Sequence, residues 1–291
     1  MLGVLLIDKP IGMTSHDVVN RVRRMLGTRR VGHAGTLDPL ATGVLVVAVG
    51  PATRFLQYLP LEPKEYVAQV AFGRSTTTFD AEGETTAEVE VPNDLDDRIT
   101  AALPSFTGLI DQLPPMYSAV KVGGQPLYKA ARRGEEVDRA SRRVHIATFE
   151  TLAASCNERT MRVVCSGGTY VRTLAHDLGE AIGIPAHLSG LRRTGVGRFR
   201  EEATLPLERI DAEHLMPLRE ALDPMPLVSL DPGEVRAVRD GKALRVDSAP
   251  NGPFAALCDT KGRVVSVARV EGDVLRPECV IPAETMPDAP F

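Results

Sequence analysis

The chain of 291 residues is 43% hydrophobic and 25% charged, a composition typical of a folded protein with a substantial core. It contains no apolar run near the ~18–20 residues of a membrane-spanning helix, and residues 2–7 lack the basic lead and the length of a secretion signal. We therefore expect a cytoplasmic protein. The four cysteines form no C-x-x-C pair, so no zinc cluster or disulfide framework is indicated.

Charge is distributed unevenly along the chain. The net charge of -4 argues against attraction of nucleic acid by the whole surface. Locally, residues 21–30 hold five arginines and no acid, residues 129–143 hold six bases and three acids, and residues 75–97 hold eight acids and no base. This segregation predicts a basic face on an acidic protein, although each basic run is equally compatible with a solvated surface.

The first elements follow from hydrophobic periodicity. Residues 2–7 predict a buried strand, and a T-x-x-D capping box at residues 14–17, followed by an apolar stripe, predicts a helix that ends at Gly27. A glycine-rich loop follows over residues 31–43, and the six apolar residues 44–49 predict a second buried strand.

Asp38 lies in this loop, directly before Pro39. Proline disfavours the helical region for the residue that precedes it, so the carboxylate is expected on extended backbone. An Asp-Pro pair is also a frequent helix start, with the aspartate as N-cap, and residue types alone favour that second interpretation.

The rest of the chain predicts a mixture of strands and helices. Tyr66 lies on the apolar face of a strand expected over residues 65–72, whereas Tyr170 and Arg172 begin an expected helix but lie off its apolar stripe. The proline-punctuated residues 201–231 predict a linker or a peripheral helix. The other expected elements are helices over 51–58, 94–103, 127–133 and from 231, and strands over 113–122, 143–152, 160–165, 254–258, 263–270 and 274–281.

The string from Gly32 to Gly43, G-H-A-G-T-L-D-P-L-A-T-G, resembles the catalytic loop of TruB-type tRNA pseudouridine synthases. The resemblance implies that Asp38 is the catalytic carboxylate and that His33 helps to hold the target nucleotide out of its stack. It also implies that Lys9, in a Lys-Pro pair, belongs to a motif near the site, although Lys-Pro alone is only a turn.

Three further motifs resemble the same family. Tyr66 ends a K-x-Y motif, and the resemblance implies that this tyrosine is catalytic: it stacks on the flipped base and assists proton removal. The string G-T-Y-V-R-T-L implies that Arg172 pairs with the catalytic carboxylate, which keeps that group ionised, and that Tyr170 lies against the base. Leu191 matches the leucine that walls the base pocket. By residue type alone, the tyrosines and the leucine are compatible with core residues, and the arginine with an ordinary surface side chain.

One motif departs from the family pattern. Residues 76–83 resemble T-D-T-x-D-A-x-G, but Thr77 stands where the family has its first aspartate. This puts in doubt the contact that the first acid makes.

The resemblance implies an α+β fold. We expect a pseudouridine synthase fold, with a large mixed, mostly antiparallel central sheet flanked by helices, over residues 1–224. An insertion at about 114–142 is expected to close over the RNA. A small PUA-like β domain is expected over residues 225–291, with a generic small β unit as the alternative.

The resemblance implies an isomerase that converts a uridine in the T-arm loop of tRNA, at position 55, to pseudouridine by base flipping and an aspartate nucleophile. This reaction requires no redox agent or metal, so no cofactor is expected. Lys9, Arg30, Arg133 and Arg192 are the cations expected to contact the RNA and to make its binding salt-dependent. No membrane and no protein partner are expected, and the chain is expected to be a monomer. The alternative is a non-catalytic RNA-binding or tRNA-folding protein on the same fold.

Overall fold

The computed structural model describes residues 1–118, 120–131, 133–135 and 137–283. The chain divides into two compact units. Unit 1 comprises residues 1–38, 44–60 and those from 202 onward, and unit 2 comprises residues 39–43 and 61–201. None of the helices in these described ranges is long and apolar enough to span a membrane.

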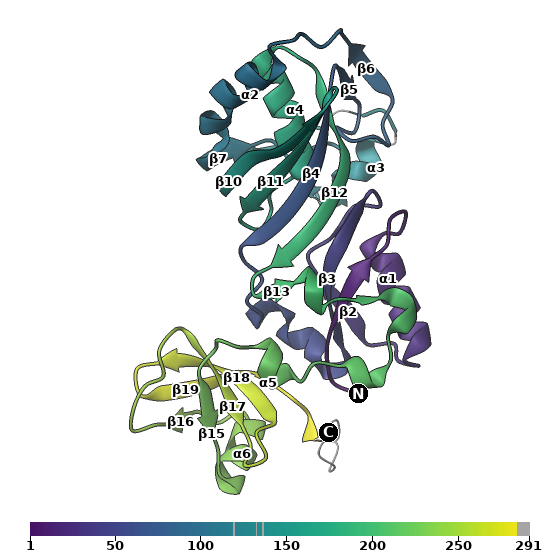
Figure 1. Cartoon of the computed structure of the whole chain (residues 1–291). Coiled ribbons are helices and arrows are strands. Elements are labelled where there is room, and N and C mark those ends of the chain that lie inside the picture. The colour runs from purple at the N-terminus through teal and green to yellow at the C-terminus, as the bar shows by residue number, and fades with distance from the viewer. Residues whose placement is uncertain (119, 132, 136, 284–291) are drawn as a thin grey trace. The chain divides into compact units, whose positions relative to one another are not determined.

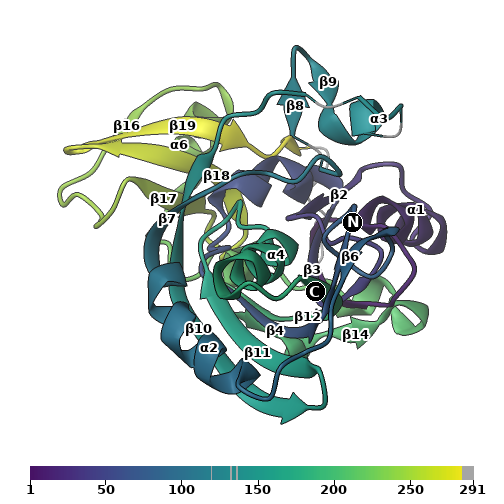
Figure 2. The same ribbon diagram turned by 90° about the horizontal axis from the view of Figure 1, so that it is seen from above.

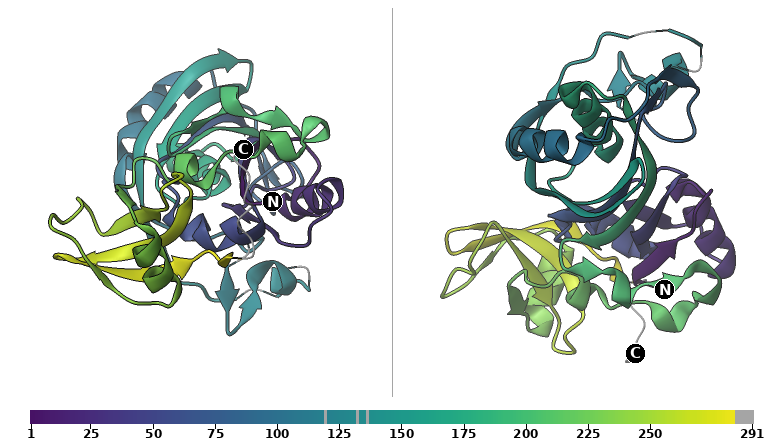
Figure 3. Two further views of the ribbon diagram at one scale, coloured as in Figure 1. Left: turned by 90° about the horizontal axis from the view of Figure 1, so that it is seen from below. Right: turned by 45° about the horizontal axis from the view of Figure 1, so that its top comes forward.

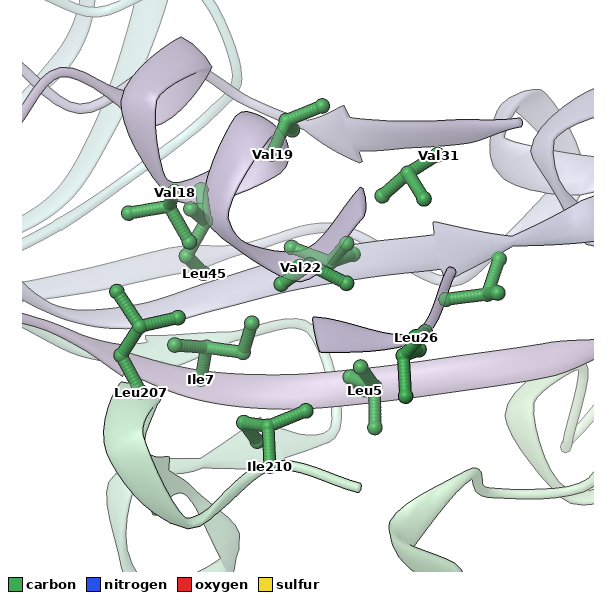
Figure 4. Packing of buried hydrophobic residues seen from close by; sticks show 12 residues of the cluster. Leu5, Ile7, Val18, Val19, Val22, Leu26, Val31, Leu45, Leu207 and Ile210 are labelled. Atoms are coloured by element: carbon green, nitrogen blue, oxygen red, sulfur yellow. The ribbon is translucent and has the colours of Figure 1, made fainter. Parts of the chain in front are cut away.

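Unit 1 begins with a small α/β core. Helix α1 (Ser15–Met25) has the expected capping box, because the Thr14 hydroxyl accepts the Asp17 N–H at 3.1 Å and the Asp17 carboxylate accepts the Thr14 N–H at 2.9 Å. The apolar stripe of α1 packs on strands β1 (Gly3–Lys9) and β3 (Ala41–Val49), as Figure 4 shows. Each buried aliphatic side chain of this kind stabilises a fold by about 1.5–3 kcal/mol. The labelled members of the cluster are Leu5, Ile7, Val18, Val19, Val22, Leu26, Val31, Leu45, Leu207 and Ile210.

Unit 2 is built on a strongly curved sheet. Its strands run in the order β12 (Ala186–Val196), β4 (Lys64–Phe72), β11 (Glu158–Cys165), β10 (Arg142–Ser155) and β7 (Gly108–Gln112). Helix α4 (Val171–Ile182) lies within the curve of β4, β11 and β12 (Figure 2), and the right-hand view of Figure 3 shows the same curvature. Helix α2 (Leu95–Ala102) packs beside α4 (Figure 1).

The central sheet has ten strands in all, in the order β14-β1-β3-β12-β4-β11-β10-β7, with β2 paired to β3 and β13 paired to β12. The pairs β1–β14 and β3–β12 are parallel, and the pairs among β4, β7, β10, β11 and β12 are antiparallel. The predicted fold class, a mixed and mostly antiparallel sheet with helices, is therefore confirmed. The remaining elements of this part of the chain are β2 (Val31–Ala34), η1 (Gly50–Tyr58), β5 (Arg74–Thr76), β6 (Thr85–Glu88), η2 (Leu103–Phe106), β8 (Lys121–Val122), β9 (Gln125–Pro126), α3 (Leu127–Ala131), β13 (Phe199–Arg200), η3 (Glu201–Ala203), β14 (Leu205–Pro206), η4 (Leu207–Arg209), η5 (Ala212–His214) and α5 (Leu218–Ala221).

The prediction of a strand over residues 113–122 is wrong. Residues 113–118 are irregular, and only Lys121–Val122 pairs as a strand, in the short hairpin β8–β9. Two consecutive prolines at 114 and 115 remove the N–H groups that a strand ladder needs, so the extended chain leaves the sheet where β7 ends. The predicted helix over 127–133 extends only to Ala131 in the described residues, and residue 132 lies outside them.

The C-terminal residues form a second sheet with its own core. Its order is β15 (Leu227–Ser229), β17 (Phe254–Cys258), β18 (Val264–Glu271), β19 (Val274–Val280) and β16 (Leu244–Arg245), and α6 (Pro232–Arg239) packs on it (Figure 1). The Asp231 side chain caps α6 as expected.

Helix η1 connects this sheet to the rest of unit 1. The Tyr58 hydroxyl donates to Glu278 at 3.1 Å, and the Arg54 guanidinium donates to the Val280 carbonyl at 3.1 Å. Burial and the neighbouring Glu278 raise the pKa of Tyr58 to about 12, so its hydroxyl remains a donor at neutral pH. The described residues from 225 onward belong to unit 1, and the domain boundary at residue 224 stays a prediction.

Candidate active site

The loop that carries Asp38 is held in place from helix α1. Ser15, which is 1% exposed, binds the backbone of Leu37, the residue before Asp38. Its hydroxyl accepts the Leu37 N–H at 2.8 Å and donates to the Leu37 carbonyl at 3.2 Å. Asp38 itself is half-buried in irregular backbone, and a strand, not a helix, begins at Ala41. The helix-start interpretation is therefore wrong, and the extended backbone expected from Pro39 stays a prediction.

Strand β3 meets β12 directly after this loop. In the parallel pairing Ala41 lies opposite Leu191 and Gly43 lies opposite Arg193. Gly43 has φ +95°, and a Cβ there would lie 2.2 Å from the Arg193 carbonyl oxygen, so only glycine allows this approach. The register places Leu191, which is half-buried, opposite a residue only three positions after Asp38.

Tyr66 lies on strand β4, the next neighbour of β12. The strand alternates as predicted, with Tyr66, Ala68 and Val70 buried, and Tyr66 is 6% exposed and opposite Arg193. Burial, reinforced by the charge of Arg193, lowers the pKa of Lys64, which is two residues before Tyr66. The tyrosine of the K-x-Y motif therefore lies in a buried and positively charged part of the sheet.

Tyr170 and Arg172 begin helix α4. Tyr170 is the N-cap residue, and two guanidiniums lie over its ring, that of Arg142 at 5.2 Å and that of Arg172 at 5.9 Å from the ring centroid. Arg172 is 6% exposed; its Nη1 donates to Asp80 Oδ2 at 3.3 Å and its Nη2 to the Tyr117 carbonyl at 2.8 Å. This burial excludes the alternative of an ordinary surface arginine.

Asp80 is a site residue that the sequence analysis missed. It is 2% exposed, forms the buried ion pair with Arg172, and accepts the Glu82 N–H at 3.1 Å and the Thr78 hydroxyl. The signal for it is in the sequence, because Asp80 matches the second acid of the T-D-T-x-D-A-x-G pattern.

Thr77, at the position of that missing acid, has a local role. Its hydroxyl accepts the Glu84 N–H at 3.2 Å, and its own N–H donates to the Glu84 carbonyl at 2.9 Å. The threonine therefore helps to close the turn between β5 and β6.

The cations and the histidine predicted in unit 1 differ in exposure. Lys9 has no exposed surface, and its ammonium donates to the Pro10 and Met13 carbonyls at 2.9 and 2.5 Å, so it shapes the turn between β1 and α1. Arg30 is exposed and donates to the Thr53 hydroxyl at 3.3 Å. His33 is half-buried on β2, opposite Val47.

The cations predicted in unit 2 both have carboxylate partners. Arg133 is exposed and pairs with Glu135, with Nε and Nη2 at 2.8 and 2.7 Å from the two carboxylate oxygens. Arg192 pairs with Glu201. A phosphate group that binds either arginine has to share it with that carboxylate or displace it.

The predicted residues are thus divided between the two units. Unit 1 holds Lys9, Arg30, His33 and Asp38, and unit 2 holds Tyr66, Arg133, Tyr170, Arg172, Leu191 and Arg192. Within unit 2 the structure brings Tyr170 and Arg172 together with Asp80, and neighbouring strands carry Leu191 and Tyr66. Over the described residues, no group of three His, Cys, Asp or Glu side chains is arranged to hold a metal ion.

Comparison with known proteins places the chain in a family. Residues 23–171 match the family described as "TruB family pseudouridylate synthase (N terminal domain)", and residues 172–227 match "tRNA pseudouridylate synthase B C-terminal domain". The chain is 44% identical to tRNA pseudouridine synthase B of Cupriavidus metallidurans, covering 96% of this chain and 94% of that protein. It is 46% identical to the protein of the same name from Thermobifida fusca, covering 91% and 94%.

Among solved structures, the crystal structure of a Cbf5-Nop10-Gar1 complex is similar with a TM-score of 0.70 and 29% identity, covering 97% of this chain and 86% of that chain. The similarity in fold therefore extends over nearly the whole chain, and so does the similarity in sequence to the two bacterial proteins. The chain belongs to the TruB family of pseudouridylate synthases.

Proposed function

We propose that the chain is a tRNA pseudouridine synthase, an isomerase that converts the uridine at position 55, in the T-arm loop, to pseudouridine. Relatives that are 42–46% identical over nearly their whole length are named tRNA pseudouridine synthase B, and this is the observation that carries the activity. The choice of position and arm is the finer part of the proposal and comes from the motif resemblance. We further propose that the chain acts as a cytoplasmic monomer.

The roles of the residues follow from chemistry and placement. Asp38 is the nucleophile; its loop is held by Ser15. Arg172 is the cation that keeps the nucleophile ionised, and its burial strengthens any such interaction because the local dielectric constant is low. Tyr66 stacks on the flipped base. Tyr170, Leu191 and His33 contact the flipped nucleotide.

The RNA backbone is held by cations. Arg30, Arg133 and Arg192 contact phosphates, while Lys9 supports the site by shaping its turn. The protein recognises the T-arm loop of the RNA through the shape of that loop and through its unstacked bases, as is usual for single-stranded RNA.

The reaction is an isomerisation, so the product has the same composition as uridine and all of its heavy atoms come from uridine. The bond from N1 of uracil to C1′ of ribose breaks, the base turns, and C5 bonds to C1′. The proton on C5 is lost to solvent and N1 gains a proton. Asp38 can act through attack on the base or on the sugar, and both routes give the same product.

The proposal is tested by release of tritium from unmodified tRNA that carries 5-³H-uridine. Wild-type protein is expected to release tritium, and Asp38→Asn is expected to release none while it still binds tRNA, because the amide keeps the shape and loses the nucleophile. Asp97→Asn, at an exposed position on α2, is the matched control and should retain full activity. Release by Asp38→Asn at the wild-type rate would contradict the catalytic role. No release by wild type, with binding intact, would favour the non-catalytic RNA-binding alternative.

A further inference from the structure

A buried glutamine, Gln112, forms two hydrogen bonds with the backbone of Tyr170. The side-chain amide of Gln112 accepts the Tyr170 N–H at 2.7 Å and donates to the Tyr170 carbonyl at 3.0 Å. Gln112 is 1% exposed and is the last residue of β7, 58 positions away in the sequence. The Gln112 amide therefore supplies Tyr170 with the acceptor and the donor that the backbone of a neighbouring strand would supply in a sheet.

This contact determines where helix α4 begins. Tyr170 is the N-cap, and none of its side-chain atoms caps the helix. Its carbonyl accepts the first helical hydrogen bond, from the Leu174 N–H at 3.2 Å, and the Gln112 donor uses the second acceptor position of the same oxygen. Arg172 lies in this first turn, so the Gln112 amide also sets the position of the guanidinium.

Strand β10, which pairs with β7, contacts the ring of Tyr170 through Arg142. Arg142 lies opposite Gln112 in the β7–β10 register, its guanidinium lies 5.2 Å from the centroid of the Tyr170 ring, and its Nη1 donates to the Gly168 carbonyl at 3.5 Å. Beyond Gln112 the chain continues to Tyr117, whose carbonyl accepts from Arg172. The strand pair and this segment contact Tyr170 and Arg172 at the backbone, the ring and the guanidinium.

We propose that Gln112 is a positioning residue for pseudouridine formation: its amide fixes the Tyr170 backbone and thereby aims the Tyr170 ring and the Arg172 guanidinium at the substrate. The inference rests on the proposed function. An amide side chain carries a donor and an acceptor side by side, whereas an ionised carboxylate carries acceptors only, and in a buried site an unmatched donor or acceptor is costly.

The test is Gln112→Glu, examined as a function of pH. An ionised carboxylate accepts the Tyr170 N–H but places a second acceptor against the Tyr170 carbonyl, whereas a protonated carboxyl restores the donor and acceptor pattern of the amide. At pH 8 we expect kcat for tritium release to fall by at least about tenfold, with the Kd for tRNA unchanged within about twofold. Expressed relative to wild type at each pH, activity should recover as the pH is lowered toward about 5.5.

Two variants and one physical measurement complete the test. Gln57→Glu, the same change at an exposed position on η1, should show no such recovery, and Gln112→Met should lose kcat at every pH. Hydrogen exchange of the Tyr170 amide should be slow in wild type and faster in Gln112→Met, whether or not tRNA is converted.

The outcomes separate the two proposals. The positioning role would be overturned if Gln112→Glu had the same kcat as wild type at pH 8. It would also be overturned if the Gln112 variants lost thermal stability without losing kcat. If wild type releases no tritium, the proposed function fails, and unchanged Tyr170 exchange in Gln112→Met would then overturn the Gln112 contact by itself.

Discussion

The buried ion pair between Asp80 and Arg172 makes the sharpest prediction about stability. The two side chains are 3% and 6% exposed, and the joined atoms, Asp80 Oδ2 and Arg172 Nη1, are 3.3 Å apart. Removing one member of a buried pair leaves an uncompensated charge and costs about 3–5 kcal/mol. We expect Asp80→Ala to lower the free energy of unfolding by that amount. Asp80→Asn keeps the size and an acceptor oxygen, so we expect about half the loss.

The assay is urea-induced unfolding at pH 7, followed by circular dichroism, with tritium release measured on the same preparations. Asp94→Ala is the matched control, because Asp94 pairs with Arg98 at 2.9 Å while both side chains are 44–51% exposed. Exposed pairs of this kind contribute at most about 1 kcal/mol. Both Asp80 variants should also lose kcat, because Arg172 is then held only by its remaining contacts. Equal losses of unfolding free energy in Asp80→Ala and Asp94→Ala would refute the reasoning.

Three further predictions concern the sheet, the pH dependence and the RNA. Gly43→Ala should cost at least about 2 kcal/mol of unfolding free energy, since its Cβ would lie 2.2 Å from a backbone oxygen, whereas Gly241→Ala, with positive φ but open space, should cost about 1 kcal/mol. Burial raises the pKa of Asp177 to about 6 from 3.8, so the folded state favours the neutral form; the resulting stability is present below pH 4 and lost as the pH rises through 6. Asp177→Asn should therefore raise the free energy of unfolding relative to wild type at pH 7–8 by about 1–2 kcal/mol, after allowance for partial exposure, and the difference should close near pH 4. An equal difference at both pH values in urea-induced unfolding would contradict this. Arg30→Glu and Arg133→Glu should each weaken tRNA binding and reduce the slope of log K against log salt concentration by about 0.7–0.9. Filter binding at several salt concentrations measures this slope, and an unchanged slope would show that these arginines contact no phosphate.

Local pattern was sufficient where neighbouring residues decide the structure. The capping box at residues 14–17 and the alternation of β4 depend on contacts within a few positions, and both were predicted from the sequence. Family membership came from ordered motifs, since a string of twelve matching positions is specific where Asp38 alone is not.

Partners far apart in the sequence were decided only by the tertiary structure. Asp80 and Arg172 are 92 positions apart, and Gln112 and Tyr170 are 58 apart, and no local pattern marks either pairing. The sequence alone also predicted a strand at residues 113–122, where the prolines take the chain out of the sheet. Periodicity and capping report on contacts a few residues apart, whereas the partners of buried polar groups depend on which strands the sheet register brings side by side.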